Sequence, residues 1–265
     1  MDLSEYTKLC TMHDITRGTV RIMVFKVLVN GALLCMKEIQ SMSEKTSERE
    51  IKMYRSIPRH DNLAYFVGAV TKKTEALLFL TLYDTSLEDL IEDVVPPSVS
   101  TCVEILRQSA LGLRHLHING FIHRDIKPGN IFLFLDQKTS RVISAHIGDL
   151  DFAIRMCDGP TSEIIGTVGY IAPEVLRQDN YSYEADIYSF GMTIYHLITG
   201  EYPYNNLSTR EQINEAVLAS VAPNPTKPIH NKYNDLWDLY LAATEYEPKD
   251  RITIDDLIAR LIELA

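Results

Sequence analysis

The chain contains 265 residues, of which 46% are hydrophobic and 23% are charged, and its formal net charge at pH 7 is −10. This length suffices for one large domain or for two lobes with a substantial core, and the composition is ordinary for a globular protein. The negative charge argues against nucleic-acid binding and against attraction to acidic membranes. No apolar run approaches the roughly 20 residues that a membrane span needs, so no span is expected.

The cysteines and the first residues bear on the cellular compartment. The four cysteines are scattered without a CxxC pair, so neither a zinc site nor a disulfide framework is expected. The first residues are polar and carry both acidic and basic side chains, which is unlike a signal peptide. A reducing, cytoplasmic location is therefore the default expectation.

The first third of the chain is predicted to be mostly strands. Asn30 and Gly31 lie between two runs of β-branched and apolar residues, which is the pattern of a tight hairpin turn. Ser41 and Glu44 have the spacing of a capping box, and Pro58 ends the charged segment that follows. The expected elements are strands over residues 20–29, 32–39 and 76–82 and a helix over residues 44–57.

The remainder of the chain is predicted to be mostly helical. Residues 185–199 are apolar nearly all round, which marks a buried helix, and Asn119 with Gly120 ends an earlier helix. Short apolar runs over residues 131–135 and 142–147 predict a small hairpin. Further helices are expected over residues 103–117, 213–221, 235–244 and 254–264.

A β-rich part followed by a helical part indicates an α+β fold with two lobes. The small N-lobe is expected over about residues 1–82, a hinge over about residues 81–84, and a larger helical C-lobe over about residues 85–265. A cleft between two lobes is where a nucleotide would be expected to bind.

Residues 123–130 (HRDIKPGN) place a Lys two positions and an Asn five positions after an Asp. Phosphoryl transfer needs groups of these kinds. A carboxylate accepts the proton of the attacking hydroxyl, an oxygen ligand holds Mg²⁺, and a cation offsets the charge on the transferred group. Asp125, Asn130 and Lys127 are the candidates for these three roles.

This string resembles the catalytic loop of protein kinases, and Lys127 resembles the serine/threonine class. The resemblance runs from Lys37 to Arg251 with its motifs in order, and it implies a single bilobal kinase domain over residues 1–265. It also implies transfer of the γ-phosphoryl group of ATP, with Mg²⁺, to a serine or threonine of a protein substrate. The sequence does not define an oligomeric state.

Lys37 lies on the strand after the predicted turn and resembles the kinase lysine that pairs with the α- and β-phosphates. Cys35 takes the place of the small residue that touches the adenine in this family. Glu50 resembles the acid that positions this lysine, and its distance from the helix end favours it over Glu44 and Glu48. Without the catalytic-loop resemblance, a solvent-facing lysine on an edge strand would be the simpler explanation for Lys37. A charged, solvated helix face explains Glu44 and Glu48.

The metal site is expected to contain Asn130 and Asp149. Asp149 resembles the magnesium-binding Asp of the family's Asp-Phe-Gly motif, but residues 149–151 here are Asp-Leu-Asp. Asp151 in place of Gly adds a side chain and a second negative charge beside the metal site. A rival register takes Asp151 as the first residue of the motif, and a third interpretation makes Asp151 a turn residue that points into water.

Two further contacts to the nucleotide are expected from the resemblance. Residues 14–22 match the glycine-rich loop but contain one glycine, Gly18, and a turn glycine would explain it equally well. Leu82, in the predicted hinge, is expected to line the nucleotide site.

An acidic cluster after the hinge either selects basic substrates or forms a solvated helix face. Its members are Glu88, Asp89, Glu92 and Asp93.

Residues 166–174 (GTVGYIAPE) resemble the end of a kinase activation loop. Thr167 is therefore expected near Asp125 and Lys127. Glu174 is expected to form a buried structural ion pair with Arg251.

Two more polar residues have expected roles near this loop. Asp186 opens a helix and is expected to N-cap it. In the family that the chain resembles, this residue also holds the backbone of the catalytic loop, and both roles are compatible. Arg124 is a cation on which a phosphate on Thr161 or Ser162 could dock, with Arg155 as a second candidate partner.

A pseudokinase, a binding or scaffold module on the same fold, is the competing function. The single glycine and Asp151 favour it. The complete set of Lys37, Asp125, Asn130 and Asp149 favours catalysis, because a scaffold has no chemical need for all four.

Overall fold

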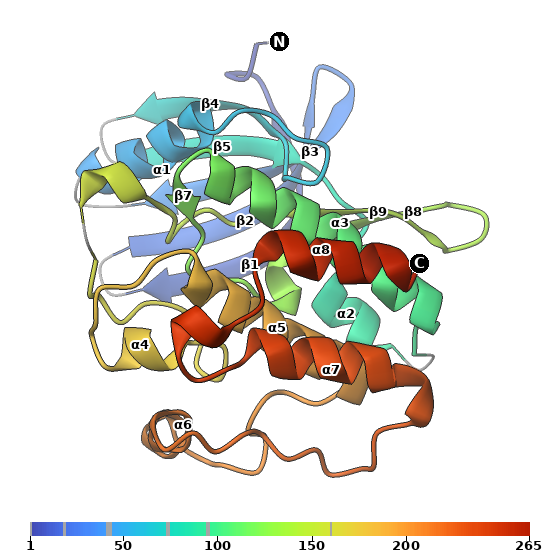
Figure 1. The fold of residues 1–265 in the computed structure, drawn as a ribbon. Coiled ribbons are helices and arrows are strands. Elements are labelled where there is room, and N and C mark those ends of the chain that lie inside the picture. Colours follow the sequence, from blue (N-terminus) through green and yellow to red (C-terminus); the bar gives the residue numbers. More distant parts are fainter. Residues whose placement is uncertain (1, 18–19, 41–43, 73–74, 94–95, 160) are drawn as a thin grey trace. The chain divides into compact units, whose positions relative to one another are not determined.

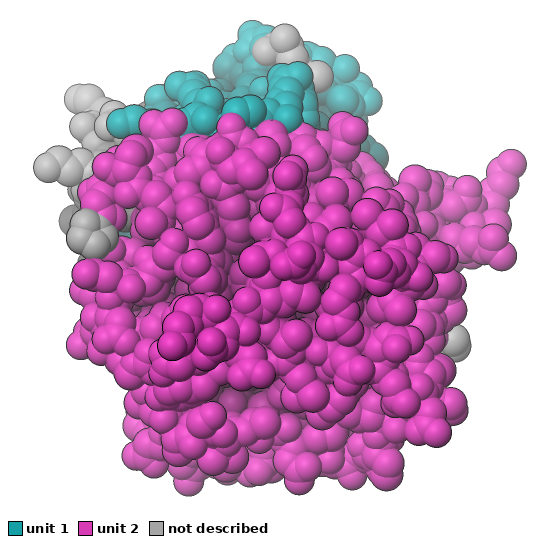
Figure 2. Space-filling model, viewed as in Figure 1, with its two compact units in different colours: residues 1–59, 63–84 teal, residues 60–62, 85–265 magenta. Residues whose placement is uncertain are grey.

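The computed structural model describes residues 2–17, 20–40, 44–72, 75–93, 96–159 and 161–265. The chain divides into two compact units, one of residues 1–59 and 63–84 and the other of residues 60–62 and 85–265 (Figure 2). The first unit is built mainly of strands and the second mainly of helices, which confirms the expected α+β class (Figure 1). Ser41, the proposed cap of the first helix, lies outside the described residues.

The first unit is a five-stranded antiparallel sheet with one helix. Its strand order is β1-β2-β3-β5-β4. The pairing of β2 with β3 ends where Val29 lies opposite Ala32. Asn30 and Gly31, with positive φ values of 50° and 82°, form the expected two-residue turn between the strands. The elements are β1 (Thr7–Arg17), β2 (Val20–Val29), β3 (Ala32–Gln40), α1 (Glu44–Ser56), β4 (Phe66–Lys72) and β5 (Glu75–Thr81).

Strand alternation divides the side chains of β3 between the two faces of the sheet. Leu34 and Met36 belong to a buried hydrophobic cluster with residues of β2 and β5, and the segment before β1 packs against this cluster. Cys35 and Lys37 lie on the opposite face. Because β3 pairs with β2 on one side and with β5 on the other, these two side chains lie in the middle of the sheet.

The sequence prediction did not include strands β1 and β4. The pairing of β1 with β2 shifts register between Lys8 and Cys10 and again between Thr11 and His13. Each bulge inserts a residue and breaks the alternation of side chains that reveals a strand in a sequence. Residues 14–17, which the glycine-loop comparison assigns to a phosphate-binding loop, therefore belong to a long strand.

The second unit is organised around helix α5, nearly all of whose residues are buried, as its sequence predicts. α5 packs against α7, and α3 lies beside α8 (Figure 1). The helices are α2 (Leu87–Glu92), α3 (Val99–Ile118), α4 (Pro173–Leu176), α5 (Glu184–Thr199), α6 (Arg210–Leu218), α7 (Asn234–Ala243) and α8 (Ile254–Glu263). The strands are β6 (Thr85–Ser86), β7 (Phe121–Ile122), β8 (Ile131–Leu135), β9 (Val142–Ile147) and β10 (Ile154–Arg155), and β8 and β9 form the expected hairpin.

Most predicted helices match the observed ones to within one residue, but α3 begins four residues before its predicted start, and α6 begins and ends three residues earlier than predicted. α3 begins at Val99, before the expected residue 103, because the Ser98 side chain accepts a hydrogen bond from the main-chain N–H of Thr101. Apolar spacing locates the middle of a helix, whereas polar caps decide where it begins. Within the described part of the chain, no helix has the length and apolar character that a membrane crossing requires.

The expected ion pair between Glu174 and Arg251 is confirmed. The two terminal nitrogens of Arg251 donate to the Glu174 carboxylate at 2.6 and 2.7 Å, and both side chains are almost completely buried. The guanidinium also donates to the main-chain oxygens of Glu184, Glu245 and Tyr246. A buried ion pair is tolerated when its remaining donors are satisfied in this way, and here it ties α4 to the segment before α8.

Buried His196 makes the stability of the fold depend on pH. It lies on α5 and shares a hydrogen bond of 2.7 Å with the Tyr170 hydroxyl. Burial lowers the pKa of His196 from 6.5 to about 4. Between these values the unfolded chain binds a proton that the folded chain excludes, so the free energy of unfolding falls as pH falls through this window, by up to about 3 kcal/mol.

The His196→Gln variant removes this titration and keeps a polar side chain. We expect urea unfolding of the parent to lose more free energy between pH 6.5 and pH 4 than unfolding of the variant. His13→Gln, at an exposed position of β1, is the matched control and should keep the slope of the parent. Equal slopes for the parent and His196→Gln would contradict the assignment.

Candidate active site

Lys37 and Glu50 form a buried ion pair in the first unit. Lys37 Nζ on β3 lies 3.0 Å from Glu50 Oε1 on α1, and the two residues are 7% and 8% exposed. The pairing that was expected between the strand lysine and this acid is therefore present. Because a buried ammonium needs a counter-charge, Glu50 holds the Lys37 side chain in a defined direction.

Cys35 lies two residues before Lys37, on the same face of the sheet. Its partners in the neighbouring strands are Lys26 of β2 and Leu80 of β5. Burial raises the pKa of the Cys35 thiol to about 11, and the nearby Lys37 charge opposes this shift only in part. Cys35 therefore presents a neutral thiol on this face at physiological pH.

In the second unit, the Asp186 carboxylate holds the start of the catalytic loop. Its Oδ2 accepts hydrogen bonds from the main-chain N–H of His123 at 2.8 Å and from His117 Nε2 at 2.9 Å, and its Oδ1 accepts from the main-chain N–H of Arg124 at 2.8 Å. Burial opposes the charge of Asp186, but the His117 hydrogen bond and the two histidines outweigh it and lower the pKa. Asp186 does not cap α5, whose N-cap is Tyr183, so the capping prediction was wrong and the backbone-holding prediction is confirmed.

Asp125 lies in a network of hydrogen bonds with the residues that the motif predicts. The Thr167 hydroxyl donates to Asp125 Oδ1 at 2.6 Å and accepts from Lys127 Nζ at 2.7 Å. Lys127 Nζ also lies 3.1 Å from Asp125 Oδ2. The expected position of Thr167 beside these two residues is confirmed. The Asp125 carboxylate thus already accepts a hydrogen bond from an aliphatic hydroxyl, that of Thr167, and the Lys127 ammonium lies beside this contact.

Asn130 is buried and its amide is oriented by Asp125. The side-chain N–H groups donate to the main-chain oxygen of Asp125 at 2.7 Å and to its Oδ2 at 3.0 Å. Both amide hydrogens are then used, and among the described residues no donor reaches Asn130 Oδ1. This oxygen is available to a ligand.

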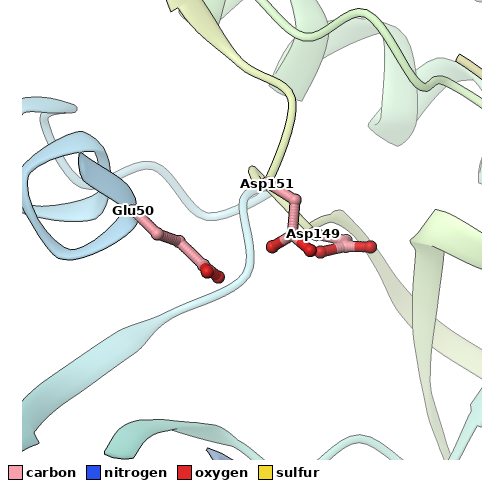
Figure 3. A group of neighbouring side chains, drawn as sticks. All are labelled: Glu50, Asp149 and Asp151. Atoms are coloured by element: carbon pink, nitrogen blue, oxygen red, sulfur yellow. The ribbon is translucent and has the colours of Figure 1, made fainter. Parts of the chain in front are cut away.

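Asp149 and Asp151 provide two carboxylates next to this region. The main-chain N–H of Gly148 donates to the main-chain oxygen of Asn130 at 3.0 Å, which places the turn after β9 beside the catalytic loop. Asp149 has a positive φ of 58°, and carboxylate oxygens of Asp149 and Asp151 lie within 4.8 Å of each other (Figure 3). Carboxylate and amide oxygens are the donors that Mg²⁺ prefers, so this set fits a magnesium ion.

Two further residues, Gly18 and Leu82, were predicted to contact the nucleotide. Gly18 lies outside the described residues. Leu82 is half-buried in the short connection that follows β5 in the first unit.

The acidic cluster has local partners in the structure. Asp89 completes a capping box with Ser86 at the start of α2. Glu88 and Glu92 both accept a hydrogen bond from the Tyr202 hydroxyl, at 2.9 and 3.2 Å. Recognition of basic substrates by this cluster stays a prediction.

Several contacts of the site were not predicted from the sequence. No local pattern in the sequence links His117 to Asp186, 69 positions along the chain. Glu163 and Tyr181 both contact the Arg124 side chain, at 3.2 Å each, and neither belongs to a motif. These contacts depend on tertiary packing alone.

The family of the chain follows from comparison with known proteins. A family model described as protein kinase domain matches residues 13–261, and the chain belongs to this family. The resemblance inferred from the catalytic loop is therefore confirmed.

Curated relatives share the same region. The chain is 32% identical over 77% of its length to kinase and exchange factor for Rac B of Dictyostelium discoideum, of which the match covers 19%. It is 32% identical over 72% of its length to probable serine/threonine-protein kinase zyg-1 of Caenorhabditis briggsae, with 27% of that protein covered. It is 27% identical over 97% of its length to mitogen-activated protein kinase kinase 3 of Arabidopsis thaliana, with 51% covered. The chain thus spans about half or less of the length of these relatives.

The state of Cys35 can be tested by alkylation. The thiolate is the reactive form, and burial raises the pKa of Cys35 to about 11 and that of Cys102 to about 12. We expect iodoacetamide at pH 7.5 to modify both at least about tenfold more slowly than the exposed Cys10 and Cys157. A time course read by peptide mass spectrometry measures this, and all four cysteines should react in urea. Equal rates for Cys35 and Cys10 in the folded protein would show that Cys35 is accessible and ionised.

Proposed function

We propose that this protein kinase domain transfers the γ-phosphoryl group of ATP to serine or threonine hydroxyls of a protein substrate. The observation that carries the proposal is the network around Asp125, in which a buried carboxylate faces the Lys127 ammonium and already accepts a hydrogen bond from the Thr167 hydroxyl. The name of one relative, probable serine/threonine-protein kinase zyg-1, supports the same class of activity.

Asp125 orients the attacking hydroxyl and accepts its proton. Asn130 fixes the carboxylate by donating to its Oδ2, and Lys127 provides a positive charge close to the same group. A carboxylate held in this way needs no reorganisation when the hydroxyl arrives, which is how a preorganised site lowers an activation barrier. Thr167 then has to give its hydrogen bond on Asp125 over to the substrate hydroxyl.

Mg²⁺, when bound, would offset the negative charge of the phosphates, and Asn130 and Asp149 are the residues that would hold it. Lys37, kept in place by Glu50, is proposed to pair with the α- and β-phosphates. Cys35 and Leu82 are proposed to line the adenine site, and Gly18 to lie in the loop over the phosphates.

We also propose that residues 1–265 form one kinase domain with its hinge at about residues 81–84. The division of the chain after Asp84 supports this hinge. A cytoplasmic location is supported by the four cysteines, all of which carry free thiols in the structure.

Asp125→Asn tests the assignment of the proton acceptor. The amide cannot accept the proton of the substrate hydroxyl, so we expect turnover to fall by on the order of 10²–10⁴ while nucleotide binding and the melting temperature stay near those of the parent. Transfer of labelled phosphate from Mg-ATP to casein, followed by phosphoamino-acid analysis, measures the rate and the acceptor residue. Asp255→Asn, an exposed change on α8, should retain full activity. Full activity of Asp125→Asn would refute the role of Asp125.

Asp149→Asn and Asp151→Gly together test which acid binds the metal. If Asp149 is the ligand, Asp149→Asn should abolish Mg²⁺-dependent transfer because the carboxylate charge is lost. Asp151→Gly should be tolerated, and removal of a like charge beside the metal should leave or raise the activity. Titration with Mg²⁺ in the transfer assay decides between them, and an inactive Asp151→Gly with an active Asp149→Asn would establish the rival register. A parent that binds nucleotide and transfers no phosphate would favour the pseudokinase instead.

A further inference from the structure

Arg124 is a buried cation directly before Asp125. Its side chain is only 2% exposed, and its φ is 69°, in the left-handed region. The guanidinium donates through Nε to the main-chain oxygen of Phe152 at 2.6 Å. Its main-chain N–H is held by Asp186, so the position of Arg124 and the position of Asp125 are linked through one peptide unit.

The positive charge of the Arg124 guanidinium is balanced by Glu163, which lies in the segment before residues 166–174 (GTVGYIAPE). A guanidinium removed from water needs a carboxylate or a similar anion, because an unpaired buried charge is strongly unfavourable. Glu163 Oε2 lies 3.2 Å from a terminal nitrogen of Arg124. Among the described residues, Glu163 is the carboxylate that forms an ion pair with this side chain. Asp186, although close, accepts from the main chain of Arg124 and not from its guanidinium.

Tyr181 provides a second link between Arg124 and the segment that contains Glu163. Its buried hydroxyl donates to the main-chain oxygen of Glu163 at 3.1 Å and accepts from Arg124 at 3.2 Å. The Thr161 hydroxyl lies 3.4 Å from both the Arg124 guanidinium and the Tyr181 hydroxyl, which is at the limit of a hydrogen bond. Residues 161–163 are thus held on Arg124 with Glu163 as the charged partner and Thr161 as a weak one.

We propose that Glu163 is a positioning residue that supplies the negative charge Arg124 requires, and that it orders the catalytic loop without a phosphate on Thr161 or Ser162. This inference rests on the proposed kinase function. The Glu163 side chain is 66% exposed, so it keeps most of its hydration, whereas Arg124 would lose its counter-ion completely if Glu163 were neutral. A phosphate on Thr161 would bring a second anion beside Glu163 and compete with it for the same guanidinium.

The experiment compares phosphatase-treated proteins whose unmodified state is verified by intact mass. The variants are Glu163→Gln, Glu163→Asp and the double change Thr161→Ala with Ser162→Ala. Glu104→Gln is the matched control, because Glu104 also pairs with an arginine (Arg107) through a partly exposed carboxylate, on α3. Two readouts are taken: kcat and KM for phosphate transfer to casein, and hydrogen exchange of residues 155–167.

We expect Glu163→Gln to lower kcat by on the order of 10- to 100-fold through displacement of Asp125, with a smaller effect on KM for ATP. Hydrogen exchange over residues 161–165 should rise in the same variant. Glu163→Asp should recover part of the activity, because it restores the charge at a shorter reach. The Thr161 and Ser162 double variant should lose far less activity than Glu163→Gln, because it removes only the weak Thr161 contact, and Glu104→Gln should behave like the parent.

The proposal is overturned if Glu163→Gln matches Glu104→Gln in both readouts, or if loss of Thr161 and Ser162 abolishes activity while Glu163→Gln does not. Failure of the proposed function would look different. In that case the parent itself transfers no phosphate, and hydrogen exchange still shows whether Glu163 holds the segment.

Discussion

The buried carboxylate of Asp186 is the interaction on which the geometry of the catalytic loop around Asp125 depends. It accepts hydrogen bonds from two successive main-chain N–H groups of the catalytic loop and from the side chain of His117. The loop between β7 and β8 has a left-handed residue at Arg124 and cannot satisfy these N–H groups by regular pairing. An acid on the largely buried helix α5 therefore defines where the loop begins, and Asp125 follows one residue after Arg124.

Three buried cations have a partner of opposite sign within their own unit. Lys37 has Glu50 in the first unit, and in the second unit Arg251 has Glu174 and Arg124 has Glu163. Replacement of such pairs by apolar side chains would cost little stability in many proteins, so stability alone does not explain them. What the three ion pairs share is that each one holds a long, flexible lysine or arginine side chain in a single orientation. A site that must present an ammonium or a carboxylate at a defined place benefits from this rigidity.

The structure combines a complete set of polar residues with two departures from the family pattern. Asp151 adds a carboxylate beside Asp149, and the stretch that matches the glycine-rich loop is occupied up to Arg17 by strand β1. Both departures lie in residues that are proposed to bind the metal or to cover the phosphates, whereas the groups around Asp125 follow the family pattern. The chemistry proposed for Asp125 therefore depends on groups that lie outside both departures.

The sequence by itself determined the fold class, the hairpin at Asn30 and Gly31, the buried helix α5 and the residues that gather around Asp125, because local patterns and a contiguous motif carry this information. It could not reveal β1, whose two bulges destroy the alternation of a strand, or the start of α3, which a cap decides. Only the tertiary structure brought His117 to Asp186 and Glu163 to Arg124. Such contacts join residues far apart in the chain, and no local periodicity records which distant side chain will balance a buried charge.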